Sequence, residues 1–158
     1  MGTIVNERIV DYINSLDKGN SPVCNAIEKE ALADGVPIIR KEMGNLLKVL
    51  LLLKRPQKIL EVGTAVGYSS ILMSENMPEN CRITTIENYE KRIPVAKNNF
   101  KRAGKEEVIT LLEGDAMDIL KELDGTYDFI DDCSENSKCN TKCRTYSYKS
   151  TNSDSYIC

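Results

Sequence analysis

The sequence contains no histidine, although it contains six cysteines. Cys24 and Cys81 stand alone, and the other four lie between Cys133 and Cys158. Their spacing includes no C-x2-C pair, which is the usual element of a structural zinc site. The pattern therefore disfavours a zinc site and a disulfide framework, and it favours unpaired thiols in a polar segment.

Long apolar runs are also absent. The longest, Val49–Leu53, is far too short to cross a bilayer. The N-terminus carries acidic residues early and lacks the apolar core of a signal peptide, so we expect a cytoplasmic protein with no membrane association. With 158 residues, 41% hydrophobic content and a net charge of -3, the chain suits one soluble domain without an overall basic field for nucleic acid.

Residues 1–56 have the periodicity of helices. Apolar side chains recur at helical spacing from Val5 to Leu16. Ser21-Pro22 predicts the start of a second helix, which Gly35 ends. Met43–Leu51 predicts a third helix, whose later turns are apolar on most sides and are expected to be buried. We interpret this segment as a scaffold.

Residues 57–130 alternate between short apolar runs and helical patterns. Strands are expected at Lys58–Val62, Arg82–Ile86, Val108–Leu112 and Tyr127–Ile130. Helices are expected between them, and Pro94 either lies in the first turns of the second helix or kinks it. Such repeats indicate the α/β class, with a Rossmann-like, doubly wound parallel sheet. In that order the first strand is central, the second and third lie on one side, and the fourth lies on the other.

Residues 131–158 follow neither pattern. They are rich in Ser, Thr, Asn and Cys, and Ile157 is their only aliphatic residue. This composition predicts a disordered tail without stable secondary structure. The sheet is then truncated after about the fourth strand. Tyr127–Ile130 is accordingly expected to form an exposed edge, and the chain is expected to self-associate.

The stretch KILEVGTAVGYSS, residues 58–70, ends a strand in two glycines spaced four apart. No Gly-Lys-Ser/Thr follows, so it is not a Walker A loop, and its spacing differs from G-x-G-x-x-G. Gly63 and Gly67 allow a tight turn and a close backbone approach to a ligand. The next helix presents free N–H groups at the same place.

Acidic residues accompany three successive strand ends: Glu61, Glu87 and Asp115. No cationic group for phosphate is present beside them. Carboxylates suit a ribose diol, an adenine amino group and a sulfonium field, as S-adenosylmethionine would provide. Simpler alternatives remain open for each residue. Glu61 could be a solvated strand end, Glu87 could be a strand terminator, and Asp115 could be a helix N-cap.

ILEVGTAVGYSS, ITTIEN, EGDA and YDFI resemble the motifs of class I S-adenosylmethionine-dependent O-methyltransferases of family 3, which includes catechol and caffeoyl-CoA O-methyltransferases. GVPIIRKEMGNLLKVLLLLKRPQ is most similar to the bacterial branch that methylates 5-hydroxyuridine in tRNA. The resemblance covers about Val5 to Ile130. It implies S-adenosylmethionine as cofactor, an acidic hydroxyl of a small molecule or tRNA as acceptor, and a homodimer for the intact family.

The resemblance also implies which positions contact the cofactor. Glu61 and Gly63 belong to the first motif, and the remaining contacts implied are Thr64 and Ser69 for the methionine part, Glu87 for the ribose, Asp115 and Ala116 for the adenine, and Ile38 or Ile39 for the covering N-terminal segment.

The family resemblance further implies a magnesium-type ion that lowers the pKa of the acceptor hydroxyl. Its ligands are an aspartate closing the fourth strand and a later Asp-Asn pair. Here Asp131-Asp132-Cys133 follows the strand, and no Asp-Asn pair comes after it. Asp132 is the candidate for the first ligand. Two functions stay open: an O-methyltransferase, or a truncated, frameshifted fragment that binds cofactor without catalysis.

Overall fold

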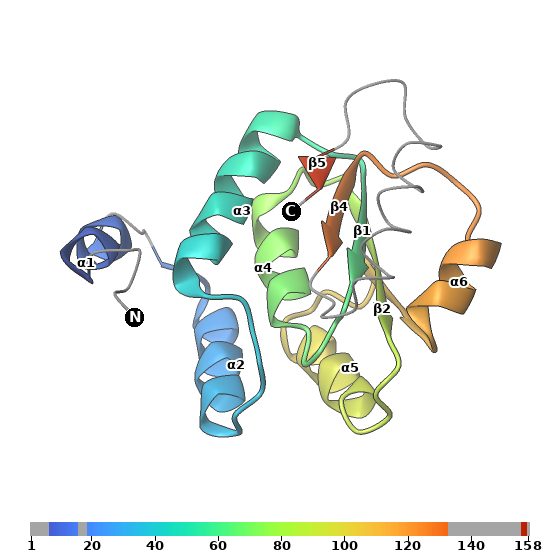
Figure 1. The fold of residues 1–158 in the computed structure, drawn as a ribbon, viewed down its shortest axis with the longest axis horizontal. Coiled ribbons are helices and arrows are strands. Elements are labelled where there is room, and N and C mark those ends of the chain that lie inside the picture. The colour runs from blue at the N-terminus through green and yellow to red at the C-terminus, as the bar shows by residue number, and fades with distance from the viewer. Residues whose placement is uncertain (1–6, 16–18, 133–155, 158) are drawn as a thin grey trace, which may run out of the picture.

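The structure, a computed structural model, describes residues 7–15, 19–132 and 156–157. A parallel sheet lies at its centre, with several helices on one side and helix α6 (Ala116–Glu122) on the other (Figure 1). The expected α/β class and Rossmann-like arrangement are confirmed. No helix among the described residues is long and apolar enough to cross a membrane. The expected cytoplasmic location stays a prediction.

The sheet has the strand order β3-β2-β1-β4-β5, and its pairings are all parallel. The strands are β1 Lys58–Val62, β2 Arg82–Glu87, β3 Ile109–Glu113, β4 Phe129–Asp132 and β5 Tyr156–Ile157. The first strand is therefore central, with the second and third on one side and the fourth on the other, as predicted. This order brings the carboxyl ends of β1, β2 and β3 to one edge.

The fourth strand begins and ends two residues later than the predicted Tyr127–Ile130. Asp128 accounts for its start, because the Asp128 carboxylate accepts a hydrogen bond from the backbone N–H of Lys58 (3.0 Å). That contact fixes the residue before the strand against the beginning of β1. Asp131 and Asp132, expected to open a disordered tail, are the last residues of β4 and pair with β1.

The prediction that the fourth strand forms the exposed edge of the sheet is wrong. Phe129 and Ile130 of β4 pair in parallel with Tyr156 and Ile157 of β5. The same pairing contradicts a tail devoid of secondary structure at these two residues. The physical reason is that the outer backbone groups of a strand need hydrogen-bond partners, which another strand supplies. The rest of the predicted tail lies outside the described residues.

The second helix begins and ends as its sequence signals predict. It is α2 (Pro22–Ala33), with a proline in its first turn. The Ser21 hydroxyl accepts a hydrogen bond from the backbone N–H of Cys24 (3.1 Å), which satisfies one of the free donors at the helix start. Gly35, just past the end, has a φ of 65°. Helix α1 (Glu7–Ser15) precedes it within the predicted first helical segment.

Helix α3 (Lys41–Lys54) is less buried than its composition predicts. Leu47 and Leu51 are fully buried, but Leu52 and Leu53 are 67% and 76% exposed. The expectation that its later turns are buried is therefore confirmed for Leu47 and Leu51 and wrong for Leu52 and Leu53. A helix that packs through one stripe covers only that stripe, however apolar its other faces are.

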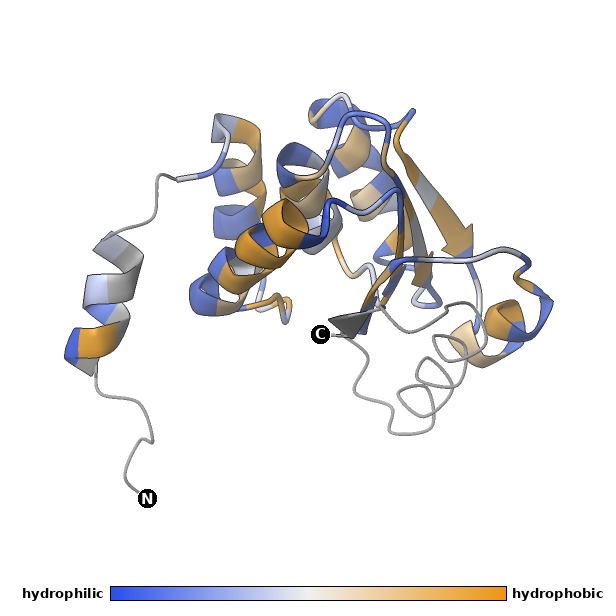
Figure 2. Ribbon diagram, turned by 90° about the horizontal axis from the view of Figure 1, so that it is seen from above, coloured by the Kyte–Doolittle hydropathy of each residue, from blue (hydrophilic) through white to orange (hydrophobic). Residues whose placement is uncertain are grey.

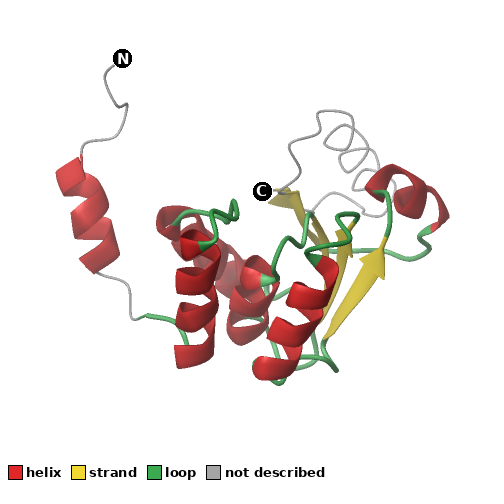
Figure 3. Ribbon diagram, turned by 90° about the horizontal axis from the view of Figure 1, so that it is seen from below, coloured by secondary structure: helices red, strands yellow, loops and turns green. Residues whose placement is uncertain are grey.

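The two faces of the sheet have separate cores. Ile59, Ile83, Ile109 and Phe129 point to the face covered by α2, α3, α4 (Tyr68–Asn76) and α5 (Ile93–Arg102). Residues one position along the strands, such as Leu60 and Ile130, point to the face covered by α6. Figure 3 shows the strands between these helices. Figure 2, coloured by hydropathy, shows largely hydrophobic strands and helices of mixed hydropathy.

Candidate functional site

The carboxyl ends of β1, β2 and β3 are tied together by backbone hydrogen bonds. Gly63 and Thr64, which follow β1, both donate their N–H groups to the carbonyl oxygen of Ile86 (3.0 and 3.1 Å). Gly114, which follows β3, donates to the carbonyl oxygen of Glu87 (2.9 Å). The structure thus brings together the three strand ends that the sequence singled out.

The segment 63–67, called here the glycine loop, contains three residues with left-handed backbone conformation. Gly63 and Gly67 have φ of 102° and 83°, and Ala65 has a φ of 48°. A side chain is disfavoured at Gly67 for a second reason, because a Cβ there would lie 2.5 Å from Cε1 of Phe100 on α5. The glycine loop is therefore shaped by its own backbone and by the helix packed beneath it.

Glu61 lies under the glycine loop and is fully buried. Its carboxylate accepts hydrogen bonds from the hydroxyls of Ser69 (2.5 Å), Thr85 (2.5 Å) and Ser70. Burial raises the pKa of Glu61, and the three hydroxyls oppose that rise. The alternative of a solvated strand end is wrong. Glu61 links β1, β2 and the first turn of α4, so it builds the floor of the candidate site.

Thr64 and Ser69, predicted to flank the methionine part of a cofactor, point their hydroxyls inward. The Thr64 hydroxyl contacts that of Thr85 (2.6 Å), and Thr64 is 1% exposed. Ser69 donates to Glu61 and is 7% exposed. Any ligand contact from Ser69 is thus expected from its backbone N–H group rather than from its side chain, whereas both the hydroxyl and the N–H of Thr64 are already engaged within the protein.

Glu87 joins the end of β2 to the glycine loop. Its Oε2 accepts a hydrogen bond from the backbone N–H of Ala65 (2.7 Å). Its Oε1 accepts from Asn88 (3.0 Å) and Tyr89 (2.9 Å). This contact across to another loop gives Glu87 a role beyond ending a strand. It also offsets the left-handed conformation of Ala65, which costs free energy in a residue with a side chain.

The other predicted site residues are less buried than Glu61, Thr64, Ser69 and Glu87. Asp115 is exposed and caps α6 by accepting from the backbone N–H of Met117 (2.7 Å), so the N-cap interpretation is confirmed. Ala116, the first residue of α6, is partly exposed. Ile39, like Ile38, is half-buried against the core on the α2–α5 face.

A magnesium site is not assembled by the described residues. Asp132 is half-buried at the end of β4, opposite Val62 of β1. Within residues 7–15, 19–132 and 156–157, no three cysteine, aspartate or glutamate side chains are grouped as metal ligands. The carboxylate set that Mg²⁺ needs is therefore not met here, and Asp132 as a ligand stays a prediction.

Three residues of the site escaped the sequence interpretation: Ser70, Thr85 and Asn99. Thr85 faces Glu61 because β1 and β2 pair in register, with Glu61 opposite Thr85. The sequence signal that could have revealed Thr85 is a hydroxyl residue inside the strand RITTIE. Asn99 is buried on α5, a helix with a basic second half, and nothing in that pattern distinguishes it from exposed Asn98.

Comparison with known proteins identifies the family. A family model described as O-methyltransferase matches residues 24–138. This chain belongs to that family. The match begins in α2 and continues past residue 130, where the sequence resemblance was expected to end.

The relatives include enzymes and solved structures of the same fold. The chain is 33% identical over 125 residues to a catechol O-methyltransferase of Niastella koreensis, covering 78% of this chain and 57% of that protein. It therefore spans little more than half the length of that relative.

Two crystal structures are similar throughout the described fold. One is the O-methyltransferase of Bacillus cereus in complex with SAH (TM-score 0.82, 22% identity, 95% of this chain and 70% of that one). The other is TomG of Streptomyces achromogenes in complex with SAM (TM-score 0.84, 24% identity, 98% and 73%). At these identities the likeness establishes the fold.

Proposed function

We propose that this chain binds S-adenosylmethionine at the carboxyl ends of β1, β2 and β3 and serves methyl transfer to the hydroxyl of a small, catechol-like acceptor. The observation that carries the proposal is the contact between Glu87 and the glycine loop, in a chain of the O-methyltransferase family. It places a strand-end carboxylate beside a loop whose backbone allows a ligand to approach closely.

The donors and acceptors present fit this cofactor. Oε2 of Glu87 accepts one hydrogen bond, from Ala65, whereas a carboxylate oxygen has two lone-pair sites. Glu87 thus retains acceptor capacity for a ribose hydroxyl. The first turn of α4, directly after the glycine loop, offers backbone N–H groups for the methionine carboxylate. Asp115 and Ala116, after β3, are the positions for the adenine. When bound, the cofactor supplies a methyl group activated by its sulfonium.

A small acceptor is favoured over tRNA by the charges on α5. Two of the basic residues of this helix are engaged with carboxylates: Lys97 with Glu113 (2.5 Å) and Arg102 with Glu30 (2.7 Å). Ion-paired cations contribute less to phosphate binding than unpaired ones. The relative named above is a catechol O-methyltransferase. Methylation of 5-hydroxyuridine in tRNA stays a prediction, as does the homodimer.

Titration calorimetry with S-adenosylhomocysteine tests cofactor binding. Glu87→Ala is expected to weaken binding by about 1–3 kcal/mol, through the loss of charge-assisted hydrogen bonds to the ribose. Glu113→Ala is the matched control, since Glu113 ends β3 directly opposite Glu87 but is exposed. Unchanged affinity in a folded Glu87→Ala variant would remove Glu87 from the site.

Methyl transfer is then measured with labelled cofactor and catechol, with and without EDTA. Because the sequence has no Asp-Asn pair after the fourth strand, we expect no magnesium-dependent transfer. Transfer that EDTA leaves unchanged supports the proposal. Binding without transfer supports the second candidate, a cofactor-binding fragment. Transfer abolished by EDTA would place metal ligands among residues that the structure does not describe.

A further inference from the structure

Helix α5 holds the glycine loop through a buried amide. Asn99 is 3% exposed, and its Nδ2 donates a hydrogen bond to the carbonyl oxygen of Val66 (2.9 Å). Val66 lies in the glycine loop, directly before Gly67. The next residue of α5, Phe100, occupies the space where a Cβ of Gly67 would lie. Two consecutive residues of one helix thus contact two consecutive residues of the loop.

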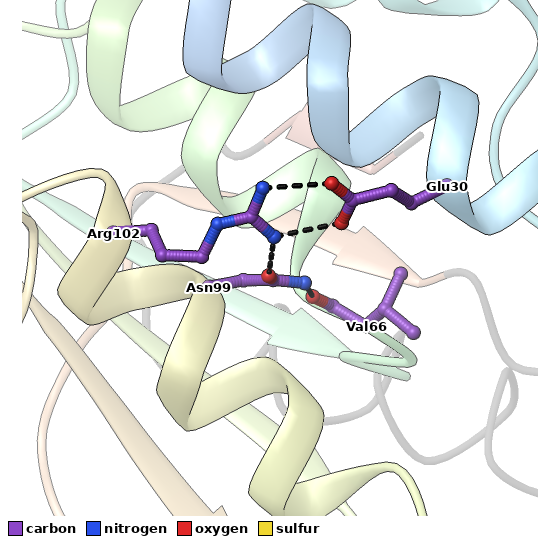
Figure 4. Close-up of polar contacts among 4 residues, drawn as sticks. All are labelled: Glu30, Val66, Asn99 and Arg102. Carbon is purple, nitrogen blue, oxygen red and sulfur yellow. Dashed lines mark hydrogen bonds and ion pairs between the residues drawn. The ribbon is translucent and has the colours of Figure 1, made fainter.

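Arg102 determines which way the Asn99 amide faces. Its Nη1 donates a hydrogen bond to Oδ1 of Asn99 (2.9 Å) (Figure 4). A guanidinium has only donors, so the amide oxygen must face it, and the amide nitrogen must face the Val66 carbonyl. The reverse orientation would set donor against donor and acceptor against acceptor.

Glu30 on α2 in turn orients Arg102. Its two carboxylate oxygens accept from Nη1 (2.7 Å) and Nη2 (2.8 Å) of Arg102, a two-bonded pair drawn in Figure 4. Such a fork fixes the plane of the guanidinium. A chain of polar contacts therefore runs from the N-terminal helices, through α5, to the glycine loop.

We propose that Asn99 is a positioning residue, which holds the glycine loop in the conformation that binds the cofactor, while Arg102 and Glu30 set the orientation of its amide. This inference rests on the proposed function. The loop contains Ala65 in a left-handed conformation, and such a conformation persists only when its surroundings determine it. Fixing Val66 keeps the neighbouring Ala65 N–H directed at Glu87.

The test uses Asn99→Asp, which keeps size and the acceptor for Arg102 but removes the donor to Val66. An oxygen then faces the Val66 carbonyl oxygen, and the loop is expected to shift. We expect the Kd for S-adenosylhomocysteine to rise about tenfold. Arg102→Gln, at a position whose side chain is 36% exposed, is expected to raise it about threefold by freeing the amide. Asn98→Asp is the matched control, because Asn98 is the exposed neighbour on the same helix.

Binding is compared with stability, since a merely structural role would lower Tm without changing Kd at temperatures where every variant is folded. Hydrogen exchange of the 63–71 segment is measured alongside, and Asn99→Asp is expected to accelerate it while Asn98→Asp does not. An Asn99→Asp variant that binds as tightly as the wild type overturns the inference. If that variant does not fold, an unchanged Kd in Arg102→Gln overturns it.

A failure of the proposed function is recognised separately. A wild-type chain that binds no S-adenosylhomocysteine removes the proposed cofactor site. In that case, hydrogen exchange of the 63–71 segment tests by itself whether Asn99 positions the glycine loop. Faster exchange in Asn99→Asp supports that role, and unchanged exchange overturns it.

Discussion

The carboxyl ends of β1 and β2 differ from the carboxyl end of β4 in how their acidic residues are used. Glu61 accepts from three hydroxyls, and Glu87 accepts from three backbone N–H groups. At β4, Asp131 and Asp132 close the strand, and the described residues group no metal-ligand set around them. The difference teaches that the proposed cofactor region is a connected polar structure in its own right, whereas the described residues at the end of β4 form no comparable group of metal ligands.

The same comparison holds for packing. The face covered by α2 to α5 includes residues from all four of the longer strands, and the glycine loop rests on α5 of that layer. The other face is covered by α6 alone among the described helices. We therefore expect perturbations near the glycine loop to affect stability and binding most, and perturbations of exposed strand ends to affect them least.

The largest effect is expected from Gly67→Ala. The new Cβ would lie 2.5 Å from Phe100, and the residue would keep a φ of 83°. Overpacking and left-handed strain together are expected to lower the free energy of unfolding by about 2–5 kcal/mol. Urea denaturation measures it. Gly104→Ala is the control: its φ is 63°, but nothing lies within 4 Å of the added Cβ, so only the strain of about 1–2 kcal/mol should appear. Equal losses in both variants would contradict the packing argument.

Thr85→Val should have the next largest effect. It removes the hydroxyl that contacts both Glu61 and Thr64 in a fully buried position. Leaving a buried carboxylate with fewer donors is expected to cost about 1–3 kcal/mol of unfolding free energy. Thr110→Val on β3 is the control, because Thr110 is exposed. A Thr85→Val chain as stable as the wild type would show that Glu61 does not depend on this hydroxyl.

Much of this structure could be predicted from local patterns. The apolar run Lys58–Val62, the Ser21 cap and the Asp115 cap each depend on neighbouring residues, and each is confirmed. The hydroxyls around Glu61 could not be predicted, because Thr85 reaches it only through the register of β1 with β2. Strand β5 could not be predicted either, since two residues carry no periodicity.

Burial was harder to predict than secondary structure. Leu52 and Leu53 end an apolar run, yet they are exposed because the buried stripe of α3 runs through Leu47 and Leu51 instead. Asn99 shows the opposite mismatch: it is a polar residue with basic residues nearby in the sequence, yet it is buried. In both helices the neighbouring element decides which side is covered, and the sequence of the helix itself does not record it.

Glu61→Gln tests the buried carboxylate through pH. Burial raises the folded-state pKa of Glu61 above its usual value, so the folded state binds this proton more tightly than the unfolded state. The stability that protonation provides is complete below the unfolded pKa and is lost as pH rises through the folded pKa. The wild type should therefore lose stability relative to Glu61→Gln as pH rises from about 4.5, by at most about 1.4 kcal/mol per pH unit. Urea denaturation of both proteins, repeated at several pH values above about 4.5, measures this. A difference in unfolding free energy that stays constant with pH would contradict the prediction.

The smallest effect is expected from Lys97→Met, which breaks the ion pair with Glu113 at the end of β3. Both side chains are about half exposed, at 56% and 48%. Water and salt screen such a pair, so we expect a change below about 1 kcal/mol in unfolding free energy. Chemical denaturation at low and high salt measures it, and the difference from the wild type should shrink as salt rises. A large, salt-independent loss would mean that the carboxyl end of β3 is held as firmly as those of β1 and β2. The contrast between buried and exposed strand-end acids would then no longer separate the residues that organise the proposed cofactor site from those that border it.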